Sequence, residues 1–296
     1  MSMNTMQKLV AGGAALLMSG TASASWLLNM PKGVTEISHA VWNLHMLILG
    51  ICTLIAVGVF GVMIYSMLHH RKSKGHQAAQ FHHSTTAEIV WTVIPFFILV
   101  GMAIPAAGTL IKMEDFSDTD MTVKITGYQW KWQYTYLDEG IDYFSTLDAA
   151  SNAARQTGAA GWGMDSLAEL RKVNDGHYLL EVDKPLVLPV GKKVRLLLTS
   201  NDVIHAWWVP DLAVKKDAIP GYINEMWTRI DKPGIYRGQC AELCGRDHGF
   251  MPVVVKAVTQ AEYDAWVAEQ KGGAPVQVAS SAPVAAAPAP AAAPAP

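Results

Sequence analysis

Two long stretches of the chain contain no charged residue. Residues 40–68 have no Asp, Glu, Lys or Arg, and residues 89–111 have none either. At about 1.5 Å per residue they would form helices of roughly 43 Å and 34 Å, long enough to span a bilayer. Pro95 and Pro105 lie in the second stretch, where neighbouring membrane helices can satisfy the carbonyls that proline frees. The pattern predicts a transmembrane helical hairpin over residues 40–112.

The segment between the two predicted spans, residues 69–88, is basic. It contains three Lys or Arg side chains and one acid, at its end, whereas residues 112–120 contain four acids and one lysine. Cytoplasmic loops of membrane proteins carry an excess of lysine and arginine. We therefore expect residues 69–88 in the cytoplasm, and residues 25–39 and the chain after residue 112 on the opposite side.

The N-terminus has the layout of a secretory signal. Lys8 precedes an apolar stretch over residues 9–18, and small residues lead up to Ala24. An apolar core of about ten residues is too short to span a membrane, which takes about twenty. We expect residues 1–24 to be a cleaved signal peptide, which agrees with residues 25–39 and the chain after residue 112 lying outside the cytoplasm.

Beyond residue 112 the apolar residues follow a period of two. Aromatic and polar residues alternate along residues 121–137, which predicts one β-strand with Tyr128, Trp130 and Trp132 on a shared aromatic face. Thr259 and Glu262 form a capping-box pattern ahead of a short closing helix. Apolar, β-branched runs predict further strands over residues 178–189, 193–199, 203–209, 226–231, 235–239 and 252–258.

These elements predict a fold class of membrane α-helices plus an all-β sandwich, with the sandwich domain over residues 113–271. Two segments do not fit a minimal sandwich. Residues 147–175 are rich in Ala, Gly and Ser, with a candidate helix over residues 166–172, and form an excursion between strands. Residues 272–296 are uncharged and mostly alanine and proline, which predicts an extended, disordered tail.

The composition agrees with a membrane protein and argues against a nucleic-acid partner. Charged residues make up 16% of the 296 residues, whereas soluble proteins average about 25%. A net charge of −2 provides no broad basic field that would hold phosphates. Three cysteines are too few for a disulfide-stapled scaffold.

Potential metal ligands gather near the end of the predicted sandwich. His205 lies in a predicted strand, and five more candidates follow within a dozen residues of one another: Cys240, Glu242, Cys244, His248 and Met251. Thiolate, imidazole and thioether together suit copper in electron-transfer sites. From the residues alone two alternatives stay open. The cysteines of a Cys-x3-Cys pair in an oxidising compartment can form a disulfide, and zinc accepts two Cys and two His but does not use a methionine.

With these residues in view, the chain resembles subunit II of the cytochrome c oxidases, members of the haem-copper oxygen reductases. The resemblance covers almost the whole chain. It is carried by the predicted hairpin, by His248 and Met251, and by the motifs Gly-Tyr-Gln-Trp-Lys-Trp (127–132), Asp-Val-Ile-His (202–205), Asp-Ala-Ile-Pro-Gly (217–221) and Gly-Gln-Cys-Ala-Glu-Leu-Cys-Gly (238–245). Tyr128 departs from the family, which commonly has His there.

The resemblance implies a cupredoxin-like sandwich that holds a dinuclear copper centre, called CuA. By this likeness Cys240 and Cys244 bridge the two copper ions. His205 and Met251 complete one copper, and His248 with the backbone carbonyl of Glu242 completes the other. The metal count therefore comes from the family likeness, not from the ligand spacing.

The resemblance also implies roles outside the copper ligands. Trp130 is similar to the tryptophan through which electrons enter, the Glu242 side chain to a ligand of the magnesium ion shared with subunit I, and Glu88 to the glutamate at the entrance of a proton path. Taken alone, Trp130 also fits a half-buried sheet aromatic, and Glu88 a helix-dipole acid. Acids that would attract a basic cytochrome c are Asp138, Glu139, Asp142, Asp202 and Asp211.

The implied function is that of an oxidase subunit. It accepts electrons from cytochrome c and passes them to haem a in subunit I, which also holds CuB, where oxygen is reduced to water and protons are pumped. The implied partners are subunits I and III, cytochrome c and membrane lipids. The alternatives are a membrane-tethered copper-binding electron shuttle or carrier, and the CuA subunit of a nitric oxide reductase. A tether needs one span, so two predicted spans favour the oxidase.

Overall fold

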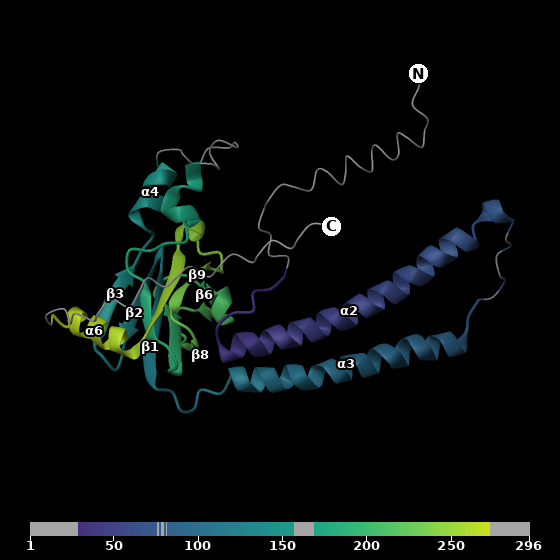
Figure 1. The fold of residues 1–296 in the computed structure, drawn as a ribbon, viewed down its shortest axis with the longest axis horizontal. Helices are drawn as coiled ribbons and strands as arrows, with labels where there is room; N and C mark the ends of the chain where they lie inside the picture. The colour runs from purple at the N-terminus through teal and green to yellow at the C-terminus, as the bar shows by residue number, and fades with distance from the viewer. Residues whose placement is uncertain (1–28, 76, 78–79, 81, 157–168, 273–296) are drawn as a thin grey trace, which may run out of the picture. The chain divides into compact units, whose positions relative to one another are not determined.

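The computed structural model describes residues 29–75, 77, 80, 82–156 and 169–272 (Figure 1). The predicted signal peptide lies outside these residues. So do the predicted tail beyond residue 272 and residues 157–168 of the excursion.

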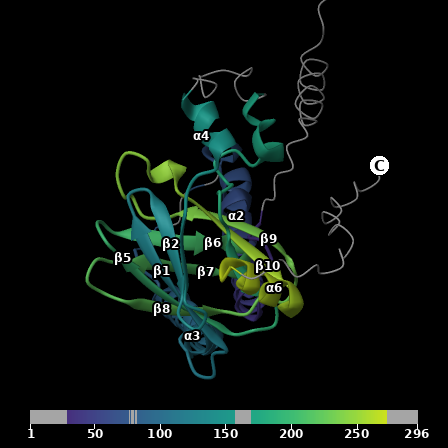
Figure 2. The same ribbon diagram turned by 90° about the vertical axis from the view of Figure 1, so that its left-hand side faces the viewer.

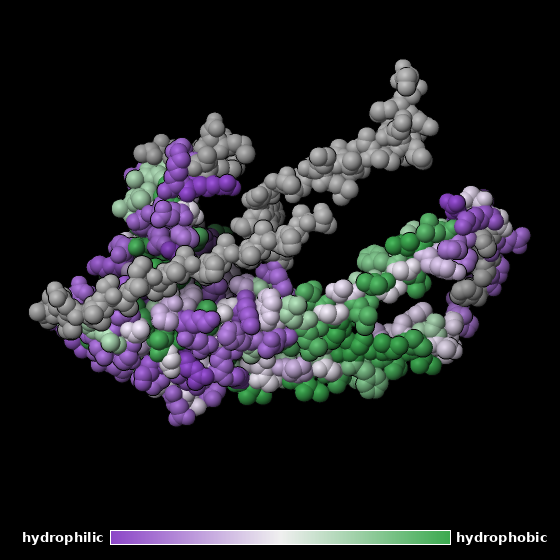
Figure 3. All heavy atoms as spheres, viewed as in Figure 1, coloured by the Kyte–Doolittle hydropathy of each residue, from purple (hydrophilic) through white to green (hydrophobic). Residues whose placement is uncertain are grey.

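Two long helices form the N-terminal part of the described chain. They are α2 (Glu36–His69) and α3 (Thr85–Met113), and both are long and apolar enough to cross a membrane. Hydrophobic side chains cover their surfaces, which they could not do stably in water (Figure 3). The helices contain both predicted spans and extend beyond each by a few residues, because their starts are fixed by the N-caps Thr35 and Ser84.

The C-terminal part is a sandwich of two five-stranded sheets (Figure 2). In the first sheet the order is β3-β2-β1-β5-β8, and in the second it is β4-β10-β9-β6-β7. The strands are β1 (Met121–Tyr128), β2 (Lys131–Tyr136), β3 (Ile141–Ser145), β4 (Leu186–Pro189), β5 (Val194–Ser200), β6 (His205–Val209), β7 (Val214–Ala218), β8 (Asn224–Thr228), β9 (Gly234–Cys240) and β10 (Pro252–Val258).

Short helices complete the sandwich. The excursion contributes α4 (Ala149–Gln156) and η2 (Val173–Gly176). Two more short helices, η3 (Pro210–Leu212) and η4 (His248–Phe250), lie in loops of the sandwich. A further one, η1 (Lys72–Lys74), lies between the two long helices. The closing helix α6 (Gln260–Gln270) begins at the predicted capping box, in which Thr259 and Glu262 bond each other's backbone N–H. Trp266 of α6 packs against Tyr136, with ring centroids 5.1 Å apart.

The core lies between the two sheets and follows the period-two pattern. Trp132 and Tyr134 of β2, Leu196 of β5 and Val255 of β10 are all fully buried. Two aromatic polar groups are satisfied inside it, because Trp207 Nε1 bonds the Tyr134 hydroxyl at 3.3 Å and the Tyr136 hydroxyl donates to the Val187 carbonyl at 2.8 Å. A closely packed core of this kind is a rigid platform for the loops that connect its strands.

The prediction of a single strand over residues 121–137 is wrong. The chain turns back at Gln129-Trp130, and β1 and β2 form an antiparallel hairpin in which Tyr128 pairs with Lys131. The turn changes the phase of the alternation, so Tyr128 shares a sheet face with Lys131 and not with the buried Trp132. Trp130 consequently lies in the turn and not in a strand.

Most of the other strand predictions are confirmed within a few residues, but one is not, and two strands were missed. The predicted strand over residues 178–189 forms only its last four residues, as β4, while β3 and β7 were not predicted. Both missed strands are sheet edges, and β7 reads Val-Lys-Lys-Asp-Ala. Charged residues are common on edge strands because they prevent pairing with other chains, and they hide the apolar alternation.

Candidate metal centre

The candidate ligands converge because β6 and β9 are neighbours in the second sheet. His205 is the first residue of β6 and Cys240 the last of β9, and the register pairs Cys240 with Trp207. The chain then forms a loop, residues 241–251, before it returns as β10. The Cys240 N–H donates to the Met251 carbonyl at 3.0 Å and closes the base of this ligand loop.

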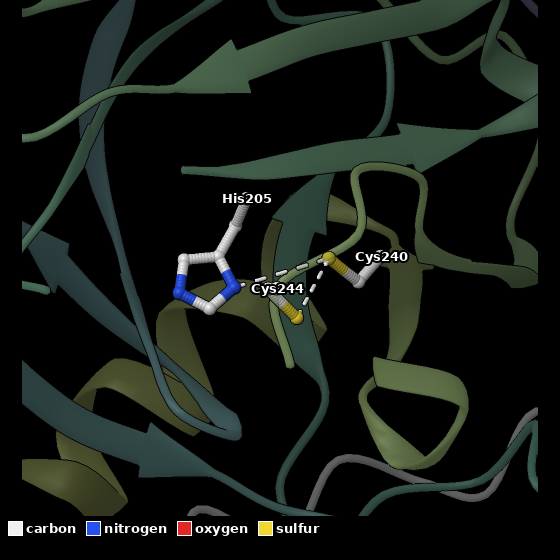
Figure 4. A group of neighbouring side chains, drawn as sticks. All are labelled: His205, Cys240 and Cys244. Carbon is white, nitrogen blue, oxygen red and sulfur yellow. Dashed lines mark hydrogen bonds between the residues drawn. The ribbon is translucent and has the colours of Figure 1, made fainter. Parts of the chain in front are cut away.

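The side chains of His205, Cys240 and Cys244 lie together in the site (Figure 4). The two cysteine sulfurs are 3.8 Å apart, His205 Nδ1 is 3.9 Å from the sulfur of Cys240, and His248 Nδ1 is 3.5 Å from the sulfur of Cys244. The Glu242 carbonyl oxygen lies 3.4 Å from the sulfur of Cys240. His205 and both cysteines are buried, and so is Met251.

The sulfurs fit a metal and not a disulfide. Both cysteines are free, and their separation of 3.8 Å is far beyond the roughly 2.05 Å of an S–S bond. A metal–thiolate bond is about 2.3 Å long in zinc sites, so one ion can reach both sulfurs at this distance. Soft sulfur donors with an imidazole beside each suit copper. Met251 ends the same loop with a buried thioether, a ligand that copper accepts and zinc does not use.

The two thiols have different acidities without metal. Burial raises the pKa of Cys240, but its hydrogen bonds with His205, His248 and the backbone of Ala206 and Glu242 together outweigh that effect and bring the pKa to about 7. Burial and the neighbouring Cys240 raise the pKa of Cys244 to about 12. Metal binding must therefore displace the Cys244 proton, since a thiolate is the ligand.

His205 is held in position from two sides. Its Nε2 donates to Asp202 at 2.9 Å, which leaves Nδ1 directed at Cys240. Burial raises the pKa of Asp202, but the hydrogen bond from His205 and backbone N–H groups lower it below its usual value. On the other side Gly127 packs so closely that a Cβ there would lie 2.8 Å from the His205 ring. Sequence reasoning named Asp202 only as a docking acid, although its Asp-x2-His spacing also fits this second role.

Trp130 contacts the ligand loop directly. It projects from the β1–β2 turn, its indole N–H donates to the Cys244 carbonyl at 3.2 Å, and the Gln129 side chain donates to the same oxygen at 3.0 Å. The indole is half-buried. Arg246 of the loop lies over its ring, 5.6 Å from the centroid.

The remaining predicted residues lie elsewhere. Glu88 is exposed in the first turn of α3, and the Glu242 side chain is exposed on the ligand loop. Of the five acids, only Asp202 adjoins the ligands. Asp138 and Glu139 follow the far end of β2, Asp142 bonds Gln133 and Thr135 of β2, and Asp211 lies in η3.

Fold and site together define a class: a β-sandwich metalloprotein with a two-helix membrane anchor. Two family models match the chain, "Cytochrome C oxidase subunit II, periplasmic domain" over residues 121–258 and "Cytochrome C oxidase subunit II, transmembrane domain" over residues 23–107. The chain belongs to the cytochrome c oxidase subunit II family.

Individual relatives agree. A probable cytochrome c oxidase subunit 2 of Rickettsia felis is 35% identical over 260 residues, covering 86% of this chain and 76% of the relative. The cytochrome c oxidase subunit 2 of Cereibacter sphaeroides is 34% identical over 276 residues, covering 89% and 91%. The solved periplasmic domain of subunit II of cytochrome oxidase of Bradyrhizobium japonicum is 36% identical, over 52% of this chain and 96% of that one, with a TM-score of 0.42.

Membership settles the class of function. The chain is a copper-binding subunit of an oxidase complex, and a membrane protein whose C-terminal domain is periplasmic. Membership of this family favours an oxidase subunit over a tethered electron shuttle and over a subunit of a nitric oxide reductase.

Proposed function

We propose that this chain takes single electrons from cytochrome c at a dinuclear copper centre and hands them to haem a in subunit I, where CuB also lies. The observation that carries the proposal is the pair of buried, unlinked sulfurs 3.8 Å apart, with one imidazole against each. When bound, two copper ions bridged by thiolates supply reversible one-electron chemistry shared over both metals.

Each ligand has a role in this proposal. Cys240 and Cys244 bridge the metals, His205 and Met251 hold one, and His248 and the Glu242 carbonyl hold the other. The near-symmetric placement of the imidazoles supports this division, because each faces a different sulfur. Close packing keeps the buried ligands in place and excludes water, so little has to move when an electron arrives or leaves.

Trp130 is the proposed point where electrons enter. Its half-buried indole is one hydrogen bond from the carbonyl of a copper-bridging cysteine, which supports a short path from the surface to the metals. We centre the cytochrome docking face on Trp130. The Asp202 carboxylate adjoins this face, because it accepts a hydrogen bond from the Gln129 N–H at 2.7 Å. The other four predicted acids contribute to the longer-range attraction.

The test is the rate of electron transfer from reduced cytochrome c to the copper-loaded full chain in detergent. Replacing Trp130 by Phe should slow this transfer and leave the copper content unchanged, because the indole is not a ligand. Trp208→Phe is the matched control, since Trp208 is a tryptophan of β6 with 38% of its surface exposed. The wild-type association rate should also fall as salt is added, because opposite charges steer the encounter. An unchanged rate in Trp130→Phe would contradict this entrance.

Four further points complete the proposal. The exposed Glu242 side chain ligates a magnesium ion shared with subunit I, and Glu88 lies at the cytoplasmic entrance of a proton path. Subunits I and III and membrane lipids surround α2 and α3, whose exposed apolar surfaces need such neighbours. Residues 1–24 direct the chain to the bacterial inner membrane.

A further inference from the structure

One arginine of the excursion contacts the ligand loop at two points. Arg155 lies in the last turn of α4, and its Nη1 is 3.4 Å from the carboxylate of Asp247. Its guanidinium carbon is 4.4 Å from the centre of the Phe250 ring. The side chains of Arg155 and Asp247 are 25% and 17% exposed, so this ion pair is largely shielded from water.

These two contacts flank two of the proposed copper ligands. Asp247 immediately precedes His248, and Phe250 immediately precedes Met251. The Asp247 side chain makes no capping hydrogen bond to η4, and its carboxylate instead pairs with Arg155 and Arg246. A planar guanidinium can pair with a carboxylate and stack on a ring at once, which a lysine cannot do.

The excursion is itself firmly anchored, so it can hold a loop. The Asp148 carboxylate accepts hydrogen bonds from Ala150 and Ser151 at the start of α4, and from the Asn174 side chain at 2.8 Å. The Ser151 hydroxyl is fully buried and accepts from the Leu179 N–H at 3.2 Å. α4 is therefore tied to the chain on the far side of the excursion.

A second contact ties the same region to β9. Glu181, which follows the excursion, forms an ion pair with Arg237, and Arg237 Nε lies 2.7 Å from the Glu181 carboxylate. Both side chains are less than a quarter exposed. Arg237 is three residues before Cys240 on β9, and the Asp148 N–H donates to the Glu181 carbonyl at 3.1 Å. The excursion and the residues that follow it are thus joined to β9, which ends at Cys240, and to the ligand loop.

We propose that α4 acts as a clamp on the ligand loop, and that Arg155 is its positioning residue. Arg155 holds His248 and Met251 near their binding positions before metal arrives, which reduces the ordering that metal binding has to impose. The identity of the metal rests on the proposed function above. The clamp itself acts on the metal-free chain and can be tested there.

The first test is amide hydrogen exchange of the metal-free full chain in detergent. Arg155→Ala should speed exchange in residues 245–251 and leave β5 unchanged. Arg155→Lys should give a smaller effect, because it keeps the charge and loses the stacking. Arg171→Ala is the matched control, since Arg171 is an exposed arginine of the same excursion. Phe250→Leu, which removes the ring under the guanidinium, is a second variant and should loosen the same residues.

The second test is copper retention against a chelator. Loss of a residue that orients metal ligands typically weakens binding about 10–100-fold, so copper should leave Arg155→Ala faster by a factor in that range, while Arg171→Ala matches wild type. If Arg155→Ala and Phe250→Leu both exchanged loop amides and lost copper at the wild-type rates, the proposal of a clamp would be wrong. Faster loop exchange in Arg155→Ala, in a chain that binds no copper pair, would support the clamp and contradict the proposed copper function.

Discussion

At the scale of single residues, the site depends on small groups that leave room for ligands. Gly127 is the clearest case, because its missing side chain leaves space for the His205 ring. His205 then faces Cys240 through Nδ1 and Asp202 through Nε2, so its orientation is set by packing on one side and by a hydrogen bond on the other.

Replacing Gly127 by Ala should displace His205. The new Cβ would lie 2.8 Å from the ring, closer than van der Waals contact allows, so the ring or the backbone of β1 has to shift. Overpacking of this kind costs about 1–3 kcal/mol. We expect a lower thermal midpoint and faster copper loss to a chelator. Gly249→Ala is the control, since a Cβ there meets nothing within 4 Å. Equal copper retention in both variants would count against this role of Gly127.

At the scale of elements, the sequence predicted those helices and strands whose formation depends on residues close together in the chain. The spans, β10 and the cap of α6 follow from hydropathy, alternation and the Thr259–Glu262 pair, all of which are visible in short windows of sequence. The turn at Gln129-Trp130 was missed because aromatic alternation continues on both sides of it. Edge strand β7 was missed because its three central residues, Lys215, Lys216 and Asp217, are charged and lie outside the core, so the strand shows no apolar alternation.

The capping box of α6 gives a prediction of stability. Thr259→Ala removes the acceptor for the Glu262 N–H and should lower the free energy of unfolding by about 1 kcal/mol. Thr259→Ser keeps the hydroxyl and should stay within a few tenths of wild type. Thermal unfolding of the two variants measures the difference. An alanine variant as stable as the serine variant would mean that the packing of Tyr263 and Trp266 alone holds α6.

The anchor of α4 should depend on pH through Asp148. Burial raises the pKa of this carboxyl, but the hydrogen bonds from Asn174, Ser151 and Ala150 outweigh it and hold the pKa below the ordinary 3.8. A carboxyl with a lowered pKa in the folded state stabilises that state above its unfolded pKa and loses the contribution as pH falls through the folded value.

We therefore expect the protection of α4 amides to be constant above about pH 4 and to fall at lower pH. Exchange rates corrected for the intrinsic effect of pH measure this protection. In Asp148→Asn the α4 amides should be less protected at neutral pH and should show a flatter profile. Protection that rises on acidification of the wild type would contradict the assignment.

At the scale of the whole molecule, the site is assembled by topology. Family motifs named the candidate ligands, but no pattern in the sequence joins Arg155 to Asp247, since that contact depends on the fold that brings α4 to the ligand loop. The same holds for Trp130, whose contact with Cys244 depends on a hairpin turn that alternation did not reveal. Long-range pairings of this kind are where prediction from the sequence stopped.

The membrane helices carry a prediction for the assembled oxidase. Glu88→Ala at the start of α3 should slow turnover and leave the copper spectrum unchanged, because the role we propose for Glu88 is in proton uptake and not in copper binding. Glu114→Ala is the control, an exposed acid that follows the other end of α3 and pairs with Lys216 at 3.4 Å. Turnover measured in the complex with subunit I decides the matter, and an unchanged rate in Glu88→Ala would remove Glu88 from the path.

The most direct measurement is copper stoichiometry and the electron paramagnetic resonance spectrum of the copper-loaded full chain. We predict two coppers per chain and hyperfine structure in which one electron couples equally to two copper nuclei, because paired thiolates with one imidazole against each sulfur favour a shared electron. Cys240→Ser and Cys244→Ser should each abolish that spectrum. One copper per chain with coupling to a single nucleus, or no copper with the cysteines joined as a disulfide, would contradict the account.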